Sequence, residues 1–203
     1  MKVFGFAEEN LPIRFPLIMN SPLSSSSVLT RIQLSTGLTA FKCPETLGIF
    51  IPISSYARWL SKQAPSESPA LDEISIEHDS STNSTRALIC PESGALMQRY
   101  RVIADTPFFV DRSPSGSIWL DKGEWESLES VHLDKHLNRI FTNTWQGSIR
   151  QKETDMNRTQ LYKSKLGEDL YHQVVSMANE HREHPYRGMI ITLFTEVAAS
   201  IKK

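Results

Sequence analysis

The chain has 203 residues, of which 39% are hydrophobic and 22% are charged, a composition typical of a soluble globular protein and not of a disordered or fibrous one. Its 22 lysines and arginines nearly balance its 23 acids, and this balance argues against a dedicated nucleic-acid binder while leaving room for a local basic patch. No apolar run reaches the roughly 18 to 20 residues of a membrane helix, and two glutamates lie where a signal peptide would be apolar, so we expect a cytoplasmic protein.

An internal repeat occupies the N-terminal part of the chain. With an offset of 69 residues and no gap, residues 19–60 align with residues 88–129. The triplet at 49–51 falls on the triplet at 118–120, and each reads isoleucine, aromatic, aliphatic. Two unrelated segments can share single apolar residues by chance, but they rarely share a whole series of apolar residues at the same spacing. We therefore expect two copies of one structural unit.

Each repeat is predicted to form three short antiparallel strands joined by tight turns. These strands cover residues 28–34, 38–43 and 47–51 in the first repeat and residues 96–103, 107–111 and 117–120 in the second. Gly37 and the Asp105-Thr106-Pro107 segment supply the turn residues at the two hairpin tips. Residues 61–87 are rich in serine, proline and acids, which indicates a mostly mobile linker whose one candidate edge strand is 71–76.

The C-terminal third is expected to be helical. Asp121 and Glu124 have the spacing of a capping box, in which the aspartate oxygen accepts the free amides of the first helical turn. Apolar residues at three-or-four spacing then predict helices over about 122–149, 155–181 and 187–201.

The repeats resemble the zinc ribbon of the transcription-factor-IIB-like family, whose general form is CPxC, a strand-turn-strand of about 18 residues, CPxCGGxWLD and then GELE leading into a helix. The closest match is SIWLDKGEWESL at 117–128. The segment LGEDLY at 166–171, with HP at 184–185, also resembles the C-terminal region of two-ribbon bacterial members. The resemblance implies a degenerate member of this family.

In that family four thiolates of each ribbon hold a zinc ion in a tetrahedron. The resemblance places the eight ligand slots at Ser21, Ser24, Cys43 and Thr46 in the first repeat and at Cys90, Ser93, Arg112 and Ser115 in the second. Only two slots carry cysteine, neutral hydroxyls are poor zinc ligands, and an arginine repels the metal. We therefore expect both sites to be vestigial, with no metal and no cofactor. The alternative is a zinc ion held by Cys43, Cys90 and histidines.

The resulting expectation is an α+β fold: two small, duplicated, metal-free antiparallel β ribbon-like repeats followed by a C-terminal helical region. Its domains are an N-terminal segment with the first repeat, a linker, the second repeat and the helical region, at residues 1–62, 63–87, 88–129 and 130–203. Cys43 and Cys90 are expected to be buried, reduced thiols, and a disulfide between them is the alternative.

Loss of the metal has an energetic consequence. Structural zinc contributes roughly 10 to 16 kcal/mol to folding in small fingers, and isolated ribbons are too small to replace it by apolar burial. The repeats are therefore predicted to pack on each other or on the C-terminal helices as one cooperative unit. The predicted core comprises Ile49, Phe50, Ile51, Tyr56, Trp59, Phe108, Val110, Ile118, Trp119, Leu120 and Trp125.

Other candidate functional residues have a simpler structural interpretation. Asp121, Glu124 and Glu126 form an acidic cluster suited to acid-base chemistry, but a helix cap explains Asp121 more simply. Two histidine pairs at one-turn spacing are candidate metal ligands without a third partner: His132 with His136, and His181 with His184. No phosphate-binding glycine loop, nucleophile elbow or zinc-protease motif is present.

The sequence therefore predicts a non-enzymatic interaction module that binds a protein partner or self-associates. The alternative is a regulator that contacts nucleic acid or the transcription machinery through Arg31, Arg99 and Arg101, together with Arg112, on the ribbon hairpins. The third hypothesis is an enzyme that uses Asp121, Glu124 or a histidine in a groove between the repeats and the helices.

Overall fold

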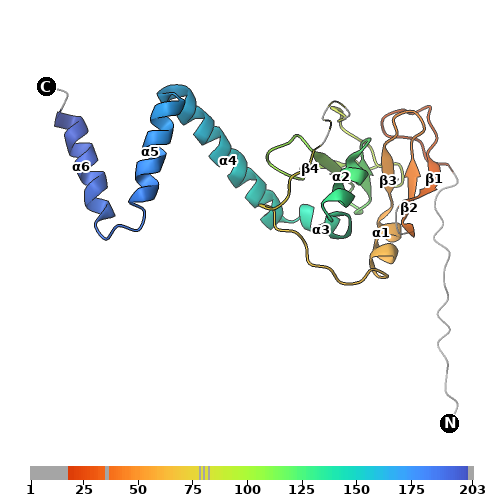
Figure 1. Cartoon of the computed structure of the whole chain (residues 1–203). Helices are drawn as coiled ribbons and strands as arrows, with labels where there is room; N and C mark the ends of the chain where they lie inside the picture. Colours follow the sequence, from red (N-terminus) through yellow and green to blue (C-terminus); the bar gives the residue numbers. More distant parts are fainter. Residues whose placement is uncertain (1–17, 35–36, 78, 80, 82, 201–203) are drawn as a thin grey trace, which may run out of the picture. The chain divides into compact units, whose positions relative to one another are not determined.

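The computed structural model of the protein describes residues 18–34, 37–77, 79, 81 and 83–200 (Figure 1). The chain divides into two compact units, Met1–Gln151 and Lys152–Lys203. Residues 130–151, which were assigned to the helical region, thus lie in the first unit. Most of the N-terminal segment lies outside the described residues.

The first unit contains one antiparallel sheet of six strands in the order β1-β2-β3-β6-β5-β4 (Figure 1). The strands are β1 Thr30–Gln33, β2 Thr39–Lys42, β3 Ile49–Ile51, β4 Gln98–Arg101, β5 Phe109–Arg112 and β6 Ile118–Leu120. Each lies at the predicted place, and only β5 extends one residue further. The expected α+β fold with two three-strand halves is confirmed, and the halves share a single sheet.

The two halves meet where β3 pairs with β6. Phe50 lies opposite Trp119, Ile49 opposite Leu120 and Ile51 opposite Ile118. Because the repeat makes β3 and β6 equivalent, this register relates the halves by a two-fold axis through the Phe50–Trp119 pair. Each half thereby covers the strand edge that the other would leave exposed.

Equivalent backbone hydrogen bonds refine the alignment of the repeats. Ser21 N donates to Ser27 O where Cys90 N donates to Ala95 O, so this loop is one residue longer in the first repeat. Cys43 N donates to Gly48 O where Ser113 N donates to Ser117 O, again with one residue more in the first repeat. The β4–β5 tip, in contrast, is longer than the β1–β2 tip by two residues.

The gap-free offset of 69 residues is therefore right at the ends of the repeats and wrong inside the hairpins. Ser113-Pro114, and not Arg112-Ser113, is equivalent to Cys43-Pro44. With this correction all four loops begin with a buried serine or cysteine followed by proline: Ser21, Cys43, Cys90 and Ser113.

A short helix follows the last strand of each half. These helices are α1, Ile53–Leu60, and α2, Glu124–Ser130, and the repeat places Tyr56 and Trp125 at equivalent buried positions on them. The predicted helix over 122–149 is wrong because α2 ends at Ser130 and the chain leaves the helix through the left-handed residue His132, with φ 58°. His132 N donates to Glu129 O and Leu133 N to Leu128 O, the bonds of a Schellman cap.

Beyond that cap the chain continues as a 3₁₀ turn, Asp134–His136, and the one-turn helix α3, Leu137–Ile140, before α4 begins at Asn143. Leu133, Leu137, Ile140, Trp145 and Ile149 from these segments are buried in the main core.

The core has two parts because alternate strand residues point to opposite faces of the sheet. All eleven predicted core residues are buried. Phe50 and Trp119 lie in the smaller cluster with both cysteines, and the remaining nine lie in the larger cluster with α1 and α2. Ile74 and Ile76 of the linker are buried in the larger cluster too, although 71–73 is a turn and 74–76 has no regular structure, so the candidate strand is not formed.

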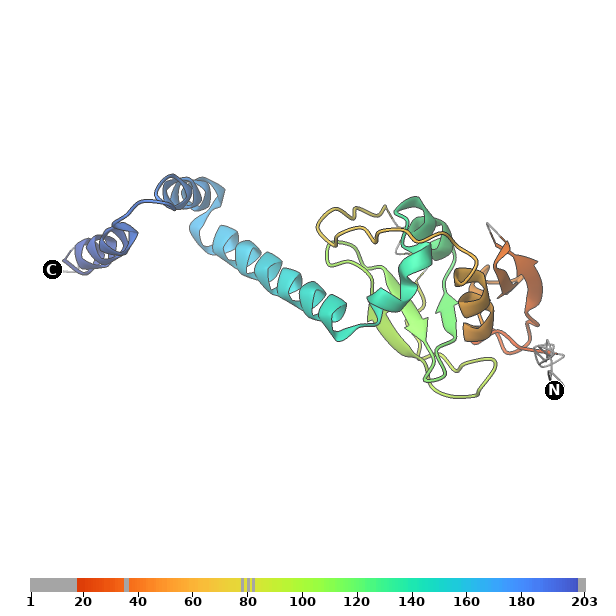
Figure 2. The same ribbon diagram turned by 90° about the horizontal axis from the view of Figure 1, so that it is seen from below.

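The second unit consists of helices. They are the C-terminal part of α4, Asn143–Leu166, then α5, Glu168–Glu180, and α6, Arg187–Ser200 (blue in Figure 2). The predicted helix over 155–181 is interrupted at Gly167, whose φ of 81° is left-handed. The third helix has its predicted place, and residue 201 lies outside the described residues. Within the described ranges, no helix is long and apolar enough to cross a bilayer.

The packing at the two-fold axis leads to a prediction about two glycines. A Cβ on Gly48 would lie 2.3 Å from Trp119 Cζ2, so Gly48→Ala is expected to lower the free energy of unfolding by about 1–3 kcal/mol through overpacking. Gly147 lies in α4 with its nearest neighbour atom 4.0 Å away, and Gly147→Ala is expected to raise that free energy by about 0.5–1 kcal/mol. Urea unfolding followed by tryptophan fluorescence measures both, and equal effects would contradict the prediction.

Candidate functional site

One row of directly opposed residues crosses all six strands on one face of the sheet. In strand order its members are Arg31, Phe41, Phe50, Trp119, Asp111 and Arg99. The row is symmetric in outline, with an arginine at each edge and an aromatic pair at the centre. The halves differ in chemical character at one position, because Asp111 stands where the first half has Phe41, whereas Phe50 and Trp119 are both aromatic. The second half therefore carries a buried charge that requires partners.

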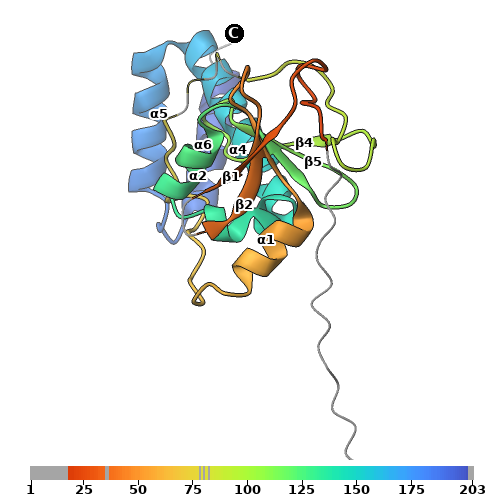
Figure 3. The ribbon, with the colours of Figure 1, turned by 90° about the vertical axis from the view of Figure 1, so that its right-hand side faces the viewer.

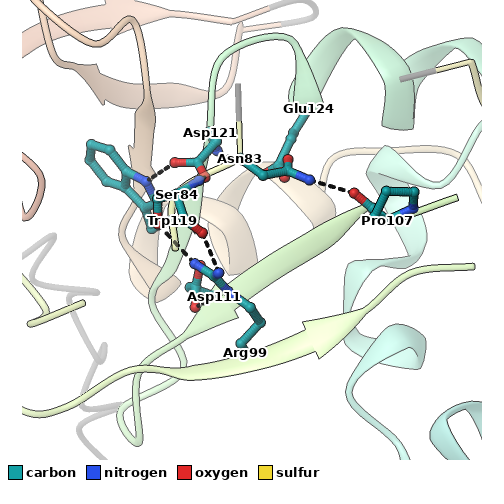
Figure 4. Close-up of polar contacts among 8 residues, drawn as sticks. All are labelled: Asn83, Ser84, Arg99, Pro107, Asp111, Trp119, Asp121 and Glu124. Atoms are coloured by element: carbon teal, nitrogen blue, oxygen red, sulfur yellow. Dashed lines mark hydrogen bonds and ion pairs between the residues drawn. The ribbon is translucent and has the colours of Figure 1, made fainter. Parts of the chain in front are cut away.

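Arg99 is the main partner of Asp111. Its Nη2 lies 2.9 Å from Asp111 Oδ2, and its Nε lies 3.2 Å from Asp111 Oδ1. The same guanidinium donates to the backbone carbonyl of Ser84 and, at 2.9 Å, to the Ser84 hydroxyl (Figure 4). Burial raises the pKa of Asp111, and the pairing with Arg99 offsets this rise only in part. The ion pair thus holds the linker residue Ser84 against β4.

Asp121, just after β6, holds the same linker segment from the other side. Its Oδ1 accepts a hydrogen bond of 2.9 Å from Trp119 Nε1, and its Oδ2 accepts one of 2.6 Å from Ser84 N (Figure 4). Asp121 N in turn donates to Glu124 Oε2 at 2.7 Å. The predicted capping box is therefore half right. Glu124 makes its bond, but Gly123 is the N-cap residue of α2 and no side chain caps the helix.

Glu124 is nearly fully buried, and this burial raises its pKa well above the ordinary glutamate value. The charge of Asp121 adds to the rise, and the folded protein therefore favours the protonated side chain. Glu126, the third member of the predicted acidic cluster, is exposed on α2. Asp111, Asp121 and Glu124 are three buried carboxyl groups of this region, and their hydrogen bonds tie the linker and α2 to the sheet.

The first ligand set is partly brought together. Cys43 Sγ lies 3.4 Å from both Ser27 Oγ and Thr46 N, whereas Ser24 Oγ donates to Glu45 Oε2 at 2.5 Å. Burial by itself raises the pKa of the Cys43 thiol, but hydrogen bonds with Ser21, Ser27 and Thr46 outweigh it and lower the pKa to about 7.

The second ligand set is rearranged. Cys90 is buried, Ser93 is exposed, and Ser115 Oγ lies 2.8 Å from Ser113 Oγ. The assignment of Arg112 to a ligand slot is corrected, because Ser113 is the equivalent of Cys43. The Arg112 guanidinium lies over the Phe141 ring instead, 4.9 Å from its centroid.

Both cysteines are free, so the alternative of a Cys43–Cys90 disulfide is wrong. In the part of the chain that the structure describes, no group of three or more His, Cys, Asp or Glu side chains is arranged to hold a metal ion. His136 Nε2 lies 3.1 Å from Ser66 Oγ, and His132, His181 and His184 are exposed.

The candidate arginines are only partly brought together: the guanidinium groups of Arg99 and Arg101 lie 5.8 and 5.6 Å from the centroid of the Phe109 ring. Arg31 lies on β1 and Arg99 and Arg101 lie on β4, at opposite edges of the sheet (Figure 3). Arg101 donates to the backbone carbonyls of Ile103 at 3.0 Å and Ala104 at 2.9 Å. With Arg99 bound to Asp111, these guanidinium groups serve the packing of the hairpin.

Helices α5 and α6 present a set of exposed apolar side chains, among them Leu170, Val174, Met189, Ile191, Leu193, Phe194 and Val197. Between them lies an open groove of about 800 Å³. It is lined by Val174, Met177, Ala178, His181, Arg182, Arg187, Ile190, Ile191, Phe194, Thr195 and Ala198. On another face of α6, Met189, Leu193 and Val197 are 68%, 60% and 50% exposed. The apolar spacing along 187–201 was visible in the sequence, but the sequence does not tell whether another segment covers it.

Comparison with known proteins gives no match to a family model, a curated protein or a solved structure. The zinc-ribbon resemblance therefore stays a prediction that rests on the residues quoted for it.

The buried Glu124 predicts a specific pH dependence of stability. Its pKa is higher in the folded than in the unfolded chain, so between the two values only the folded chain holds the proton, and the free energy of unfolding falls as pH rises. Glu124→Gln keeps an acceptor for Asp121 N but does not titrate. Urea unfolding from about pH 5 to about pH 8 is expected to show a flatter dependence for this variant. The exposed control Glu126→Gln should follow the wild type, and a Glu124→Gln profile as steep as the wild-type profile would refute the assignment.

The Arg99–Asp111 pair is expected to be strongly coupled. A double-mutant cycle with Arg99→Met and Asp111→Leu should give a coupling of about 1.5–3 kcal/mol, because each single change leaves a half-buried or buried charge without its partner. The exposed pair Arg158–Asp155 is the control and should give less than about 0.5 kcal/mol. Equal coupling of both pairs would show that the buried network is not a structural constraint.

Proposed function

We propose that the protein is a non-enzymatic interaction module that binds another polypeptide through the apolar surface of α5 and α6. The observation that carries this proposal is an uncovered apolar helix. Neither α5 nor α6 has a buried residue, although α6 contains Met189, Ile190, Ile191, Leu193 and Phe194 within one stretch. A helix that is apolar around most of its circumference is normally buried.

Helix length supports the same proposal. Helices α5 and α6 have 13 and 14 residues, and isolated helices of this length are only marginally stable in water. Contacts that stabilise them must therefore come from tertiary or intermolecular packing. Exposed apolar surface of this extent on a globular domain typically marks a site of protein association.

The duplicated sheet supports a scaffold role for the first unit. Asp111, Asp121 and Glu124 are engaged in internal hydrogen bonds, and the candidate arginines make intramolecular contacts or lie at separate sheet edges. These contacts favour a rigid platform over a catalytic centre or a nucleic-acid surface. The association surface would then be provided by the second unit.

A photo-reactive amino acid in place of Leu193 tests the proposal in cells that express the full chain. We expect a cross-linked adduct between this chain and another polypeptide, either a second copy or a different protein. A further Phe194→Asp change should abolish the adduct, because it places a charge in the apolar groove. The same photo-reactive residue in place of the exposed Glu126 on α2 is the control. Absence of an adduct from position 193, or equal adducts from both positions, would contradict the proposal.

A further inference from the structure

We propose that Gly167 is a hinge at which α4 and α5 exchange between the bent arrangement of this structure and one continuous helix, and that Lys163 holds the bend. The proposal concerns the second unit alone and is independent of the proposed function. Three observations carry it: a break of one residue in the helix, two contacts of Lys163 across the break, and an apolar pattern that continues through it.

The break between the two helices is one residue long. Helix α4 ends at Leu166 and α5 begins at Glu168. Gly167 between them has φ 81° and ψ 156°, a backbone conformation that is open almost only to glycine. Its amide donates to Lys163 O at 2.9 Å and its carbonyl accepts from Tyr171 N at 3.1 Å, the bonds that it would make inside a helix. Rotation about the backbone bonds of one residue therefore separates the bent chain from the straight one.

A continuous helix would form backbone hydrogen bonds that the bend lacks. Glu168, Asp169 and Leu170 begin α5, and within this described stretch their amides make no backbone hydrogen bond to α4. In a straight helix they would donate to the carbonyls of residues 164–166. The straight form must in turn accept a glycine in a helix interior, where only proline is less favourable. Backbone hydrogen bonds thus favour the straight form, and the freedom of glycine favours the bend.

Apolar spacing also continues through the break. Tyr162, Leu166, Leu170 and Val174 recur every four residues, and each is between 44% and 49% exposed. Residues four apart lie on one face of a helix, where apolar pairs stabilise it. The pairs Tyr162–Leu166 and Leu170–Val174 each lie within one helix, whereas Leu166 and Leu170 share a face only when the helix is continuous. The straight form therefore completes an apolar stripe that the bend divides.

Lys163 makes two contacts that belong to the bent form. Its Nζ lies 3.2 Å from Glu168 Oε2 and 5.5 Å from the centroid of the Tyr171 ring. In a continuous helix, Tyr171 would lie about 12 Å further along the axis than Lys163, and Glu168, five residues on, would lie on a different face. His172 Nε2 also contacts Glu168 at 3.1 Å, but this pair lies within α5 and is the same in both forms.

The other charged residues beside the break do not share this role. In the stretch 163–171 they are Lys165 and Asp169, and both are exposed. The Lys163 side chain is 29% exposed, and its hydrogen bond is the main cause of the lowered pKa of Glu168. Lys165 is therefore a matched control for Lys163, with the same charge on the same helix.

The distance between two spin labels on the full chain tests the proposal. The labels are placed at Asn157→Cys in α4 and Asn179→Cys in α5, both exposed positions. Both native cysteines are buried, and the chain without the two changes measures any label that they take up. In a continuous helix the two labelled positions lie about 33 Å apart along the axis, and a bend at Gly167 shortens this distance. The wild type should show mainly the shorter distance and a minor fraction at the longer one.

Substitutions at the hinge should shift these fractions. Gly167→Ala should move most of the population to the longer distance, because alanine is disfavoured in the backbone conformation of the bend and favoured in a helix. Lys163→Met removes the charge and should raise the ratio of straight to bent chains about two- to ten-fold. Lys165→Met should leave this ratio unchanged. Added salt should raise the ratio in the wild type but not in Lys163→Met.

Four results would overturn the proposal: a wild type mainly at the longer distance, a wild type with no fraction at the longer distance at any salt concentration, a Gly167→Ala chain that keeps the shorter distance, or equal ratios in Lys163→Met and Lys165→Met. The four tryptophans precede the second unit, so their fluorescence shows that the first unit is folded in each variant. The adduct from position 193 tests the α5–α6 surface separately, so failure of the hinge leaves the proposed function standing.

Discussion

The pairing of β3 with β6 is the contact on which the rest of the first unit depends. It joins two halves that are too small to bury a core separately. The two-fold axis that relates the halves passes through this pairing, at Phe50 and Trp119. On one face of the sheet this pair anchors the cluster that contains both cysteines. On the other face, the isoleucines and leucine of the same two strands lie in one buried cluster with residues of α1 and α2. Apolar burial about one axis accounts for the cohesion of the unit.

The two halves share the same order and pairing of strands, and they differ in a buried charge at one position of the row. Phe41 needs only apolar neighbours, whereas Asp111 needs a cation, and Arg99 provides it. That arginine and Asp121 then engage Ser84, so a substitution inside the sheet determines the path of the connecting segment. The linker was expected to be mobile because its composition is polar. Composition does not reveal that the backbone amide of Ser84 bonds to Asp121 and that its hydroxyl bonds to Arg99.

Strand positions and the core were predictable because they depend on local alternation and on the repeat, both of which are visible in the sequence. All eleven predicted core residues are buried. The errors arise where a single backbone conformation decides the outcome. Left-handed residues at His132 and Gly167 end helices whose apolar spacing continues beyond them. Loop lengths inside the hairpins, which shift the ligand slot from Arg112 to Ser113, are set by hydrogen bonds that a gap-free alignment does not detect. The apolar surface of α5 and α6 followed from the pattern, but its exposure required the structure.

The contact between Gly48 and Trp119 has a consequence for the history of the duplication. The two-fold relation makes Ser117 the counterpart of Gly48 and Phe50 the counterpart of Trp119. The larger ring, the indole of Trp119, therefore faces Gly48, which has no side chain. By the two-fold relation, the smaller ring of Phe50 is paired with Ser117, which has a side chain. The larger ring is thus combined with the smaller neighbour, and the smaller ring with the larger neighbour. Two copies of the first half would leave a void there, and two copies of the second would collide, so neither half fits against a second copy of itself as well as it fits against the other half.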